Sequence, residues 1–208
     1  MFMLPNISLI TILTAFITAI FGPLMVEWIK MKFLHKKKDS LGEAISFDEK
    51  IDAQLETIMN EIKCDRICIA QFHNGGHFYP TGKSIKKFSI CYERTSEKTS
   101  PIKSIFQNIP VSLYPKMFSL LYKGTDIIIS NTKENTIDCG LFQVRGKNYK
   151  TKSFYVFPIK DINEHFIGTI TVSYYDKKYD FTLENWILIR QKMGVIGTIL
   201  TNYLHVKG

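Results

Sequence analysis

Residues 153–175 read SFYVFPIKDINEHFIGTITVSYY and hold the clearest strand pattern in the chain. Two runs rich in aromatic and β-branched residues, Ser153 to Ile159 and Phe166 to Tyr175, have the composition of β-strands. The residues between them, Lys160-Asp161-Ile162-Asn163-Glu164, are mostly polar, as in a turn. This stretch therefore predicts a β-hairpin.

Two amphipathic helices are expected at the ends of the same domain. Apolar residues recur three and four positions apart from Phe47 to Ile62, and again from Leu183 to Leu204, where Thr182 is the expected N-cap. Each helix therefore has one apolar face that must pack against another element.

Further strands and one irregular segment are expected between the first helix and the hairpin. Arg66 to Phe72 is a buried strand that ends in a turn at residues 73–76, and Phe88 to Glu93 and Asp126 to Ser130 are the next strands. A helical pattern broken by two prolines covers Ile105 to Tyr122. This order predicts an α+β domain with one antiparallel sheet, covered on one face by the first and last helices.

Residues 46–208 resemble a GAF domain. The strand ending in Pro158-Ile159, the polar turn, the strand with Ile167-Gly168-Thr169 and the closing helix carry the resemblance. It implies a sensor-type fold with a small-molecule pocket between the sheet and the mid-chain segment, often dimeric through its first and last helices. The phrase Phe72-His73-Asn74-Gly75 also resembles a subset of GAF-like sequences, some of them from phage genomes.

The densest polar and aromatic segment lies where the pocket of a GAF-like fold would open. A histidine and an asparagine there could supply a donor and an acceptor to a polar ligand between aromatic walls, with the second strand facing them. The candidate ligand-binding residues are Phe72, His73, Asn74, His77, Tyr79, Tyr92 and Glu93. The alternative is a hairpin turn that needs its glycines and leaves the histidines in solvent.

Residues 1–29 are expected to form a transmembrane anchor. No charged side chain precedes Glu27, and the roughly 20 residues from Ile7 to Val26 would span the roughly 30 Å hydrocarbon layer as a helix. Five lysines and one glutamate between residues 27 and 38 supply a net +4 of the formal +8 charge. Lysines after the span predict a single pass through the inner or plasma membrane, with the N-terminus outside, residues 30–45 as a basic linker, and a cytoplasmic domain.

Small and hydroxylated residues form one stripe of this expected helix: Ser8, Thr11, Ala15, Thr18 and Gly22. Such a stripe lets two helices approach closely, so it predicts a homo-oligomer formed through the anchor. In the alternative, the hydroxyls only bond to carbonyls of their own helix.

Composition and motifs argue against several classes of function. Four cysteines without a zinc or redox spacing predict free thiols rather than a metal site, and they do not match the contexts in which GAF proteins attach a linear tetrapyrrole. The chain has no nucleophile elbow, phosphate loop or metalloprotease motif, so no enzymatic activity is expected and the cofactor is left unknown. No aromatic-and-basic pattern indicates nucleic-acid binding.

The sequence therefore predicts a membrane-anchored GAF-like sensor that binds a small molecule or a partner. The helix from Phe47 to Ile62 would transmit the bound state. The alternative is a structural membrane protein, such as a ring, pore or lysis-type component, that uses the GAF-like fold as an oligomerisation module. Contact between His73 and Glu93 in an apolar pocket would favour the sensor.

Overall fold

The computed structural model describes residues 9–34, 40–77, 80–133, 151–175 and 177–205. The chain divides into two compact units, Met1–Ala44 and Ile45–Gly208, which we treat separately.

The first unit is dominated by the helix α1, Leu9–Leu34, which contains Pro23. Of the predicted stripe, Ser8 lies outside the described residues and the other members lie in α1. The Thr18 hydroxyl donates to the Thr14 carbonyl at 2.9 Å, so this side chain bonds within its own helix. Among the described residues, no helix combines the length and the apolar character needed to cross a membrane.

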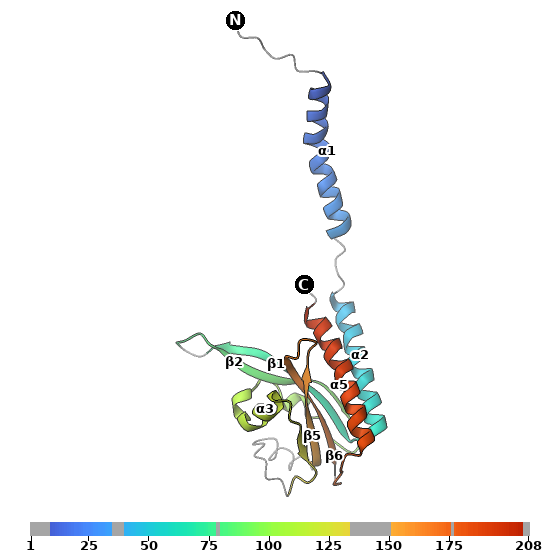
Figure 1. Cartoon of the computed structure of the whole chain (residues 1–208), viewed down its shortest axis with the longest axis vertical. Coiled ribbons are helices and arrows are strands. Elements are labelled where there is room, and N and C mark those ends of the chain that lie inside the picture. Colours follow the sequence, from blue (N-terminus) through green and yellow to red (C-terminus); the bar gives the residue numbers. More distant parts are fainter. Residues whose placement is uncertain (1–8, 35–39, 78–79, 134–150, 176, 206–208) are drawn as a thin grey trace. The chain divides into compact units, whose positions relative to one another are not determined.

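The second unit is built on one six-stranded antiparallel sheet (Figure 1). Its strands are β1 (Arg66–His77), β2 (Ser84–Thr95), β3 (Ile109–Pro110), β4 (Ile127–Ile129), β5 (Thr151–Lys160) and β6 (Phe166–Tyr175). They lie in the order β3-β2-β1-β6-β5-β4. The predicted hairpin is confirmed as β5 and β6, which pair from Thr151–Tyr175 to Lys160–Phe166.

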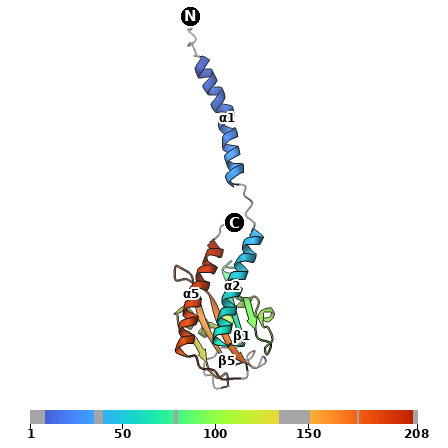
Figure 2. The same cartoon turned by 90° about the vertical axis from the view of Figure 1, so that its right-hand side faces the viewer.

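Helices α2 (Ser40–Ile62) and α5 (Leu183–His205) cover one face of the sheet side by side, as predicted (Figure 2). Phe47 stacks on Tyr203 with ring centroids 4.1 Å apart, which joins the two helices. Ile51 and Leu55 lie on the inner face of α2 and are fully buried. Burial of each such side chain contributes about 1.5–3 kcal/mol to the stability of the fold. Thr182 caps α5, because its hydroxyl accepts the Asn185 amide at 3.3 Å.

The opposite face of the sheet carries short irregular elements. These are the 3-10 turns η1 (Lys103–Ile105) and η2 (Val111–Leu113) and the helix α3 (Pro115–Tyr122). One hydrophobic core lies between the sheet and helices α2 and α5. A second core joins the irregular layer to the opposite face of the sheet through aromatic residues, including Phe88, Phe106 and Phe118. The sheet is therefore buried on both faces, with helices on one side and a looser layer on the other.

Three predicted boundaries are wrong. The turn expected at residues 73–76 is part of β1, where Gly75 makes room for a neighbour: a Cβ there would lie 2.1 Å from Lys87 Cδ. Only Pro115–Tyr122 of the expected segment from Ile105 is α-helical, because a proline fits the first turn of a helix and breaks an interior. Finally, α2 begins at Ser40, inside the expected linker.

Candidate ligand-binding site

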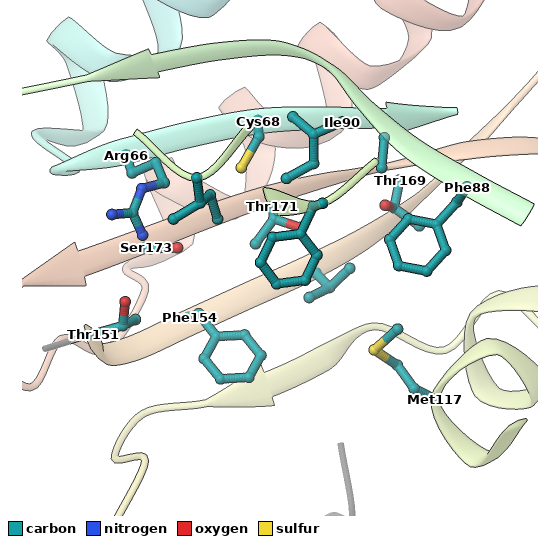
Figure 3. Close-up of a pocket in the computed structure, with 14 residues that line it drawn as sticks. Arg66, Cys68, Phe88, Ile90, Met117, Thr151, Phe154, Thr169, Thr171 and Ser173 are labelled. Atoms are coloured by element: carbon teal, nitrogen blue, oxygen red, sulfur yellow. The ribbon is translucent and has the colours of Figure 1, made fainter. Parts of the chain in front are cut away.

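The α3 side of the sheet contains a small cavity of about 40 Å³ (Figure 3). Apolar side chains from the sheet and the layer above it form one part of its wall, among them Phe88, Phe154 and Met117. Thr169, Thr171 and Ser173 occupy alternate positions of β6 and form a row of hydroxyls in the rest of the wall. Because one water needs roughly 10–15 Å³, this cavity has room for a few water-sized groups and not for a linear tetrapyrrole.

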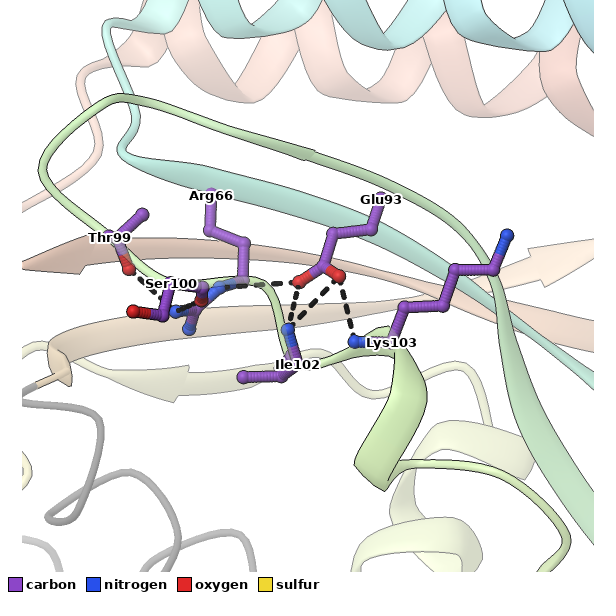
Figure 4. Close-up of polar contacts among 6 residues, drawn as sticks. All are labelled: Arg66, Glu93, Thr99, Ser100, Ile102 and Lys103. Atoms are coloured by element: carbon purple, nitrogen blue, oxygen red, sulfur yellow. Dashed lines mark hydrogen bonds and ion pairs between the residues drawn. The ribbon is translucent and has the colours of Figure 1, made fainter.

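Arg66 lies at one end of this cavity and forms a buried ion pair with Glu93 (Figure 4). Glu93 accepts the backbone amides of Ile102 and Lys103 at 2.8 and 2.7 Å, and the Arg66 guanidinium donates to the Ser100 carbonyl at 2.7 Å. Arg66 Nε lies 3.5 Å from Glu93 and makes no hydrogen bond within the described residues. The pair therefore fastens the segment 99–103 over the sheet.

Cys68 faces the same cavity, but its thiol is poorly suited to covalent chemistry. Burial raises its pKa to about 12, with a smaller contribution from the Glu93 carboxylate. A thiolate is the reactive form of cysteine, so this side chain stays protonated and unreactive at neutral pH. No group of three or more histidine, cysteine or acidic side chains that could hold a metal occurs in the described parts of the chain.

A larger opening lies beside the second core, between the distal part of the β1–β2 pair and α3. We name it the hairpin groove, and it has a volume of about 770 Å³. Its lining residues are Phe72, His73, Asn74, Lys86, Val111, Ser112, Pro115, Phe118, Ser119, Tyr122 and Phe166. Ligand pockets in proteins span roughly 300–1,000 Å³ and are mostly apolar with a few polar groups, so the hairpin groove fits this class.

An aromatic cluster separates the hairpin groove from the small cavity. Phe118 and Phe72 line the groove, and their ring centroids lie 5.5 Å apart. Phe118 also contacts Phe88, a wall residue of the cavity, at 5.3 Å. The two openings are therefore neighbours that share one aromatic wall.

The structure brings three of the predicted ligand residues together. Phe72, His73 and Asn74 all line the hairpin groove. Strand alternation places Phe72 and Asn74 on one face of β1 and the His73 side chain on the other. His73 Nε2 lies 2.9 Å from Ser89 Oγ, so the imidazole already has a hydrogen-bond partner on β2.

The expectation that Tyr92 and Glu93 face His73 is wrong. Phe72 pairs with Phe88, whereas Glu93 pairs with Cys68 and Tyr92 with Ile69, further along β1. A bulge at Cys91 causes part of this difference, because Tyr92 then points to the helix layer and Glu93 to the opposite side of the sheet, where it meets Arg66. His77 ends β1 as an exposed residue, and Tyr79 lies outside the described residues.

Strand β2 is also bonded directly to α2. Arg94 makes two hydrogen bonds to the carboxylate of Asp52, at 2.7 and 2.9 Å, and lies 3.1 Å from Glu56. The Tyr92 hydroxyl donates to Asp48 at 2.7 Å. One strand thus carries Lys86 in the hairpin groove, Glu93 in the buried ion pair, and two residues, Tyr92 and Arg94, that bond to α2.

The ion pair between Arg66 and Glu93 was not predicted from the sequence. The row of hydroxyls on β6 was not predicted either. The row leaves a signal that could have been used: a strand buried on both faces has polar residues at every second position from Thr169 to Ser173. The ion pair leaves none, because its partners are far apart in the sequence and meet only through the register of β1 and β2.

Comparisons with known proteins identify the fold. No family model matches the chain, and no curated protein matches it. The GAF domain of Thermosynechococcus elongatus PixJ, in its blue-light absorbing form, is similar with 11% identity and a TM-score of 0.60 over 79% of this chain and 90% of that one. A GAF domain/HD domain protein of Geobacter sulfurreducens has 13% identity and a TM-score of 0.58 over 78% of this chain and 97% of that one. A far-red cyanobacteriochrome photoreceptor has 11% identity and a TM-score of 0.62 over 86% of this chain and 100% of that one. The second unit therefore has a GAF-like fold, as the sequence resemblance implied.

Proposed function

We propose that this chain is a membrane-anchored sensor whose GAF-like domain binds a small molecule in the hairpin groove. Strand β2 would then pass the bound state to α2. The observation that carries the proposal is the groove itself, which combines a ligand-sized volume with aromatic walls and a polar edge at Asn74 and Lys86.

The anchoring part of the proposal is supported by the sequence. Residues 1–26 contain no charged side chain, and lysines follow at positions 30, 32 and 36–38. That order favours a single pass that leaves the domain in the cytoplasm. Carbonate extraction of membranes is the test: the full chain should stay in the membrane pellet, and a chain lacking residues 1–29 should be released.

The transmission part is supported by the contacts of β2. A ligand that touches Lys86 would act on the same strand that bonds to α2 through Arg94 and Tyr92. Small displacements of a strand pass through such hydrogen bonds because their geometry is directional.

Native mass spectrometry of the full chain tests ligand binding. A protein purified from its membrane should retain a small molecule at one copy per chain. Replacing Ser119, which lines the groove, with tryptophan should remove that molecule. Ser104→Trp is the control, because Ser104 is exposed on η1 and lines neither opening. Equal retention by Ser119→Trp and Ser104→Trp would overturn the assignment to the groove.

A structural role in an assembly is a second candidate function. Leu183, Ile187 and Val195 lie on α5 with 71%, 51% and 45% of their surfaces exposed, which favours an interaction face. In that case the protein would be empty and would form a defined oligomer, and Ile187→Glu would lower its subunit number. Retention of a ligand by a monomer would exclude this candidate.

A further inference from the structure

The polar edge of the hairpin groove consists of hydrogen-bond donors. Lys86 Nζ donates to Asn74 Oδ1 at 2.7 Å. That bond uses one of the two lone pairs of Asn74 Oδ1, and the NH₂ group of the same amide can donate two hydrogen bonds. The Lys86 ammonium has three N–H groups and no acceptor, so two of its donors are still available. Donors outnumber acceptors at this edge, so it favours a ligand that brings acceptor atoms.

The segments around the groove also lack negative charge. Residues 66–92 and 98–125, which supply every lining residue except Phe166, contain no aspartate or glutamate. The same two segments contain seven lysines and Arg66. The nearest acidic residues to Phe166 in sequence are already engaged, because Glu164 pairs with Lys160 at 2.8 Å and Asp161 lies 3.1 Å from His165. Among the described residues that line the groove, Lys86 is the one lysine, arginine or acidic residue, which favours an anionic ligand.

Four aromatic side chains, Phe72, Phe118, Tyr122 and Phe166, contribute to the walls of the groove. Phe72 packs edge-on against Phe166 and Phe118, at 4.8 and 5.5 Å between ring centroids, and Tyr122 is 73% exposed at the rim. Such walls favour a flat apolar group, which can stack on them or meet their edges.

We propose that the groove takes a small amphiphilic anion: a flat apolar body against the phenylalanine walls, and one negatively charged group at Lys86 and Asn74. This inference rests on the proposed function of the groove and names the class of its ligand. His73 is a positioning residue here, because its bond to Ser89 braces the strand pair that carries Asn74 and Lys86.

Two probes of the same shape and different charge test the proposal. Indole-3-acetate is an anion at neutral pH, and indole-3-acetamide replaces its carboxylate with a neutral amide. Binding of each probe is measured by isothermal titration calorimetry to the full chain in lipid nanodiscs, with empty nanodiscs subtracted. We expect the acetate to bind at least about tenfold more tightly, since a hydrogen bond to a charged group is stronger than a neutral one. Added salt should reduce this ratio.

Variants locate the effect. Lys86→Gln removes the positive charge of the edge, and Asn74→Asp adds a negative charge that repels the acetate. In both variants the acetate should therefore bind about as weakly as the acetamide. The affinity for the acetamide should stay unchanged. Lys98→Gln is the matched control, because Lys98 is an exposed lysine that lines neither opening. The wild-type ratio should persist in that variant.

The outcomes separate the two proposals. Equal binding of both probes, lost in Ser119→Trp, would overturn the anionic ligand and leave the groove as the binding site. Tighter binding of the acetate that survives Lys86→Gln and Asn74→Asp would overturn the proposed edge. Binding of neither probe would overturn the groove as the ligand site, and with it the proposed function.

Discussion

Arg66 Nε lies 3.5 Å from Glu93 Oε1, and 3% and 4% of the two side chains are exposed. Removing one charge of such a pair leaves the other buried, which typically costs about 3–5 kcal/mol. We expect Arg66→Met and Glu93→Gln each to lower the free energy of unfolding by about that amount, as measured by chemical denaturation. The double variant should lose less than the sum of the two. Strict additivity would show that the pair does not act as a unit.

The contact between Arg94 and Asp52 predicts a dependence of stability on pH. The Arg94 guanidinium, which donates two hydrogen bonds to Asp52, holds the pKa of that carboxyl below its ordinary value of 3.8. A lowered pKa in the folded state adds stability that is present above 3.8 and is lost as the pH falls through the folded-state pKa.

Asp52→Asn should therefore be less stable than the wild type at neutral pH, by less than about 1 kcal/mol because the pair is partly exposed. The difference should shrink in acid. Glu61→Gln, at an exposed position of the same helix, should show no such convergence. A difference between Asp52→Asn and the wild type that stays constant with pH would contradict this account.

Cysteine reactivity should follow burial. The thiols of Cys64 and Cys68 both have a pKa raised to about 12 by burial. We expect neither to react with Ellman's reagent in the folded protein, and both to react in denaturant. The test uses a chain with both Cys91→Ser and Cys139→Ser, because Cys91 is only half-buried and Cys139 lies outside the described residues. Rapid labelling of Cys68 without denaturant would mean that the cavity opens readily to solvent.

Two glycines of α5 form a matched pair for mutation. A Cβ at Gly197 would lie 2.4 Å from the Lys160 carbonyl oxygen on β5, whereas a Cβ at Gly194 would have no neighbour within 4 Å. Gly197→Ala must therefore push α5 away from the sheet and lower the melting temperature. Gly194→Ala should raise it, since alanine is favoured over glycine in a helix by about 1 kcal/mol. Equal effects of the two changes would contradict this packing.

The elements with strong local patterns could be predicted from the sequence. β5, β6 and α5 follow from composition, turn residues and periodicity, and β6 begins and ends where expected. The hydrophobic face of α2 could also be predicted, because its residues repeat with the helical period.

The candidate site could be predicted only in part, for three physical reasons. Gly75 and Gly76 suggest a turn, but in β1 the first of them gives space to Lys87 instead. The bulge at Cys91 changes which face later residues of β2 occupy, and a strict alternation does not reveal it. Lys86 and Asn74 meet through the register of β1 and β2, which residue type alone does not reveal.

The bulge in β2 has a consequence for comparing this chain with distant ones. Phe88 faces α3 and Arg94 faces α2, and with five residues between them an unbroken alternation would put both on one face. If the bulge straightened at unchanged length, Arg94 would turn away from Asp52. A strand one residue shorter in this interval would need no bulge, and its arginine would still face α2. When this chain is aligned with proteins at identities near 11%, the length of this interval and the presence of the bulge must therefore be compared together.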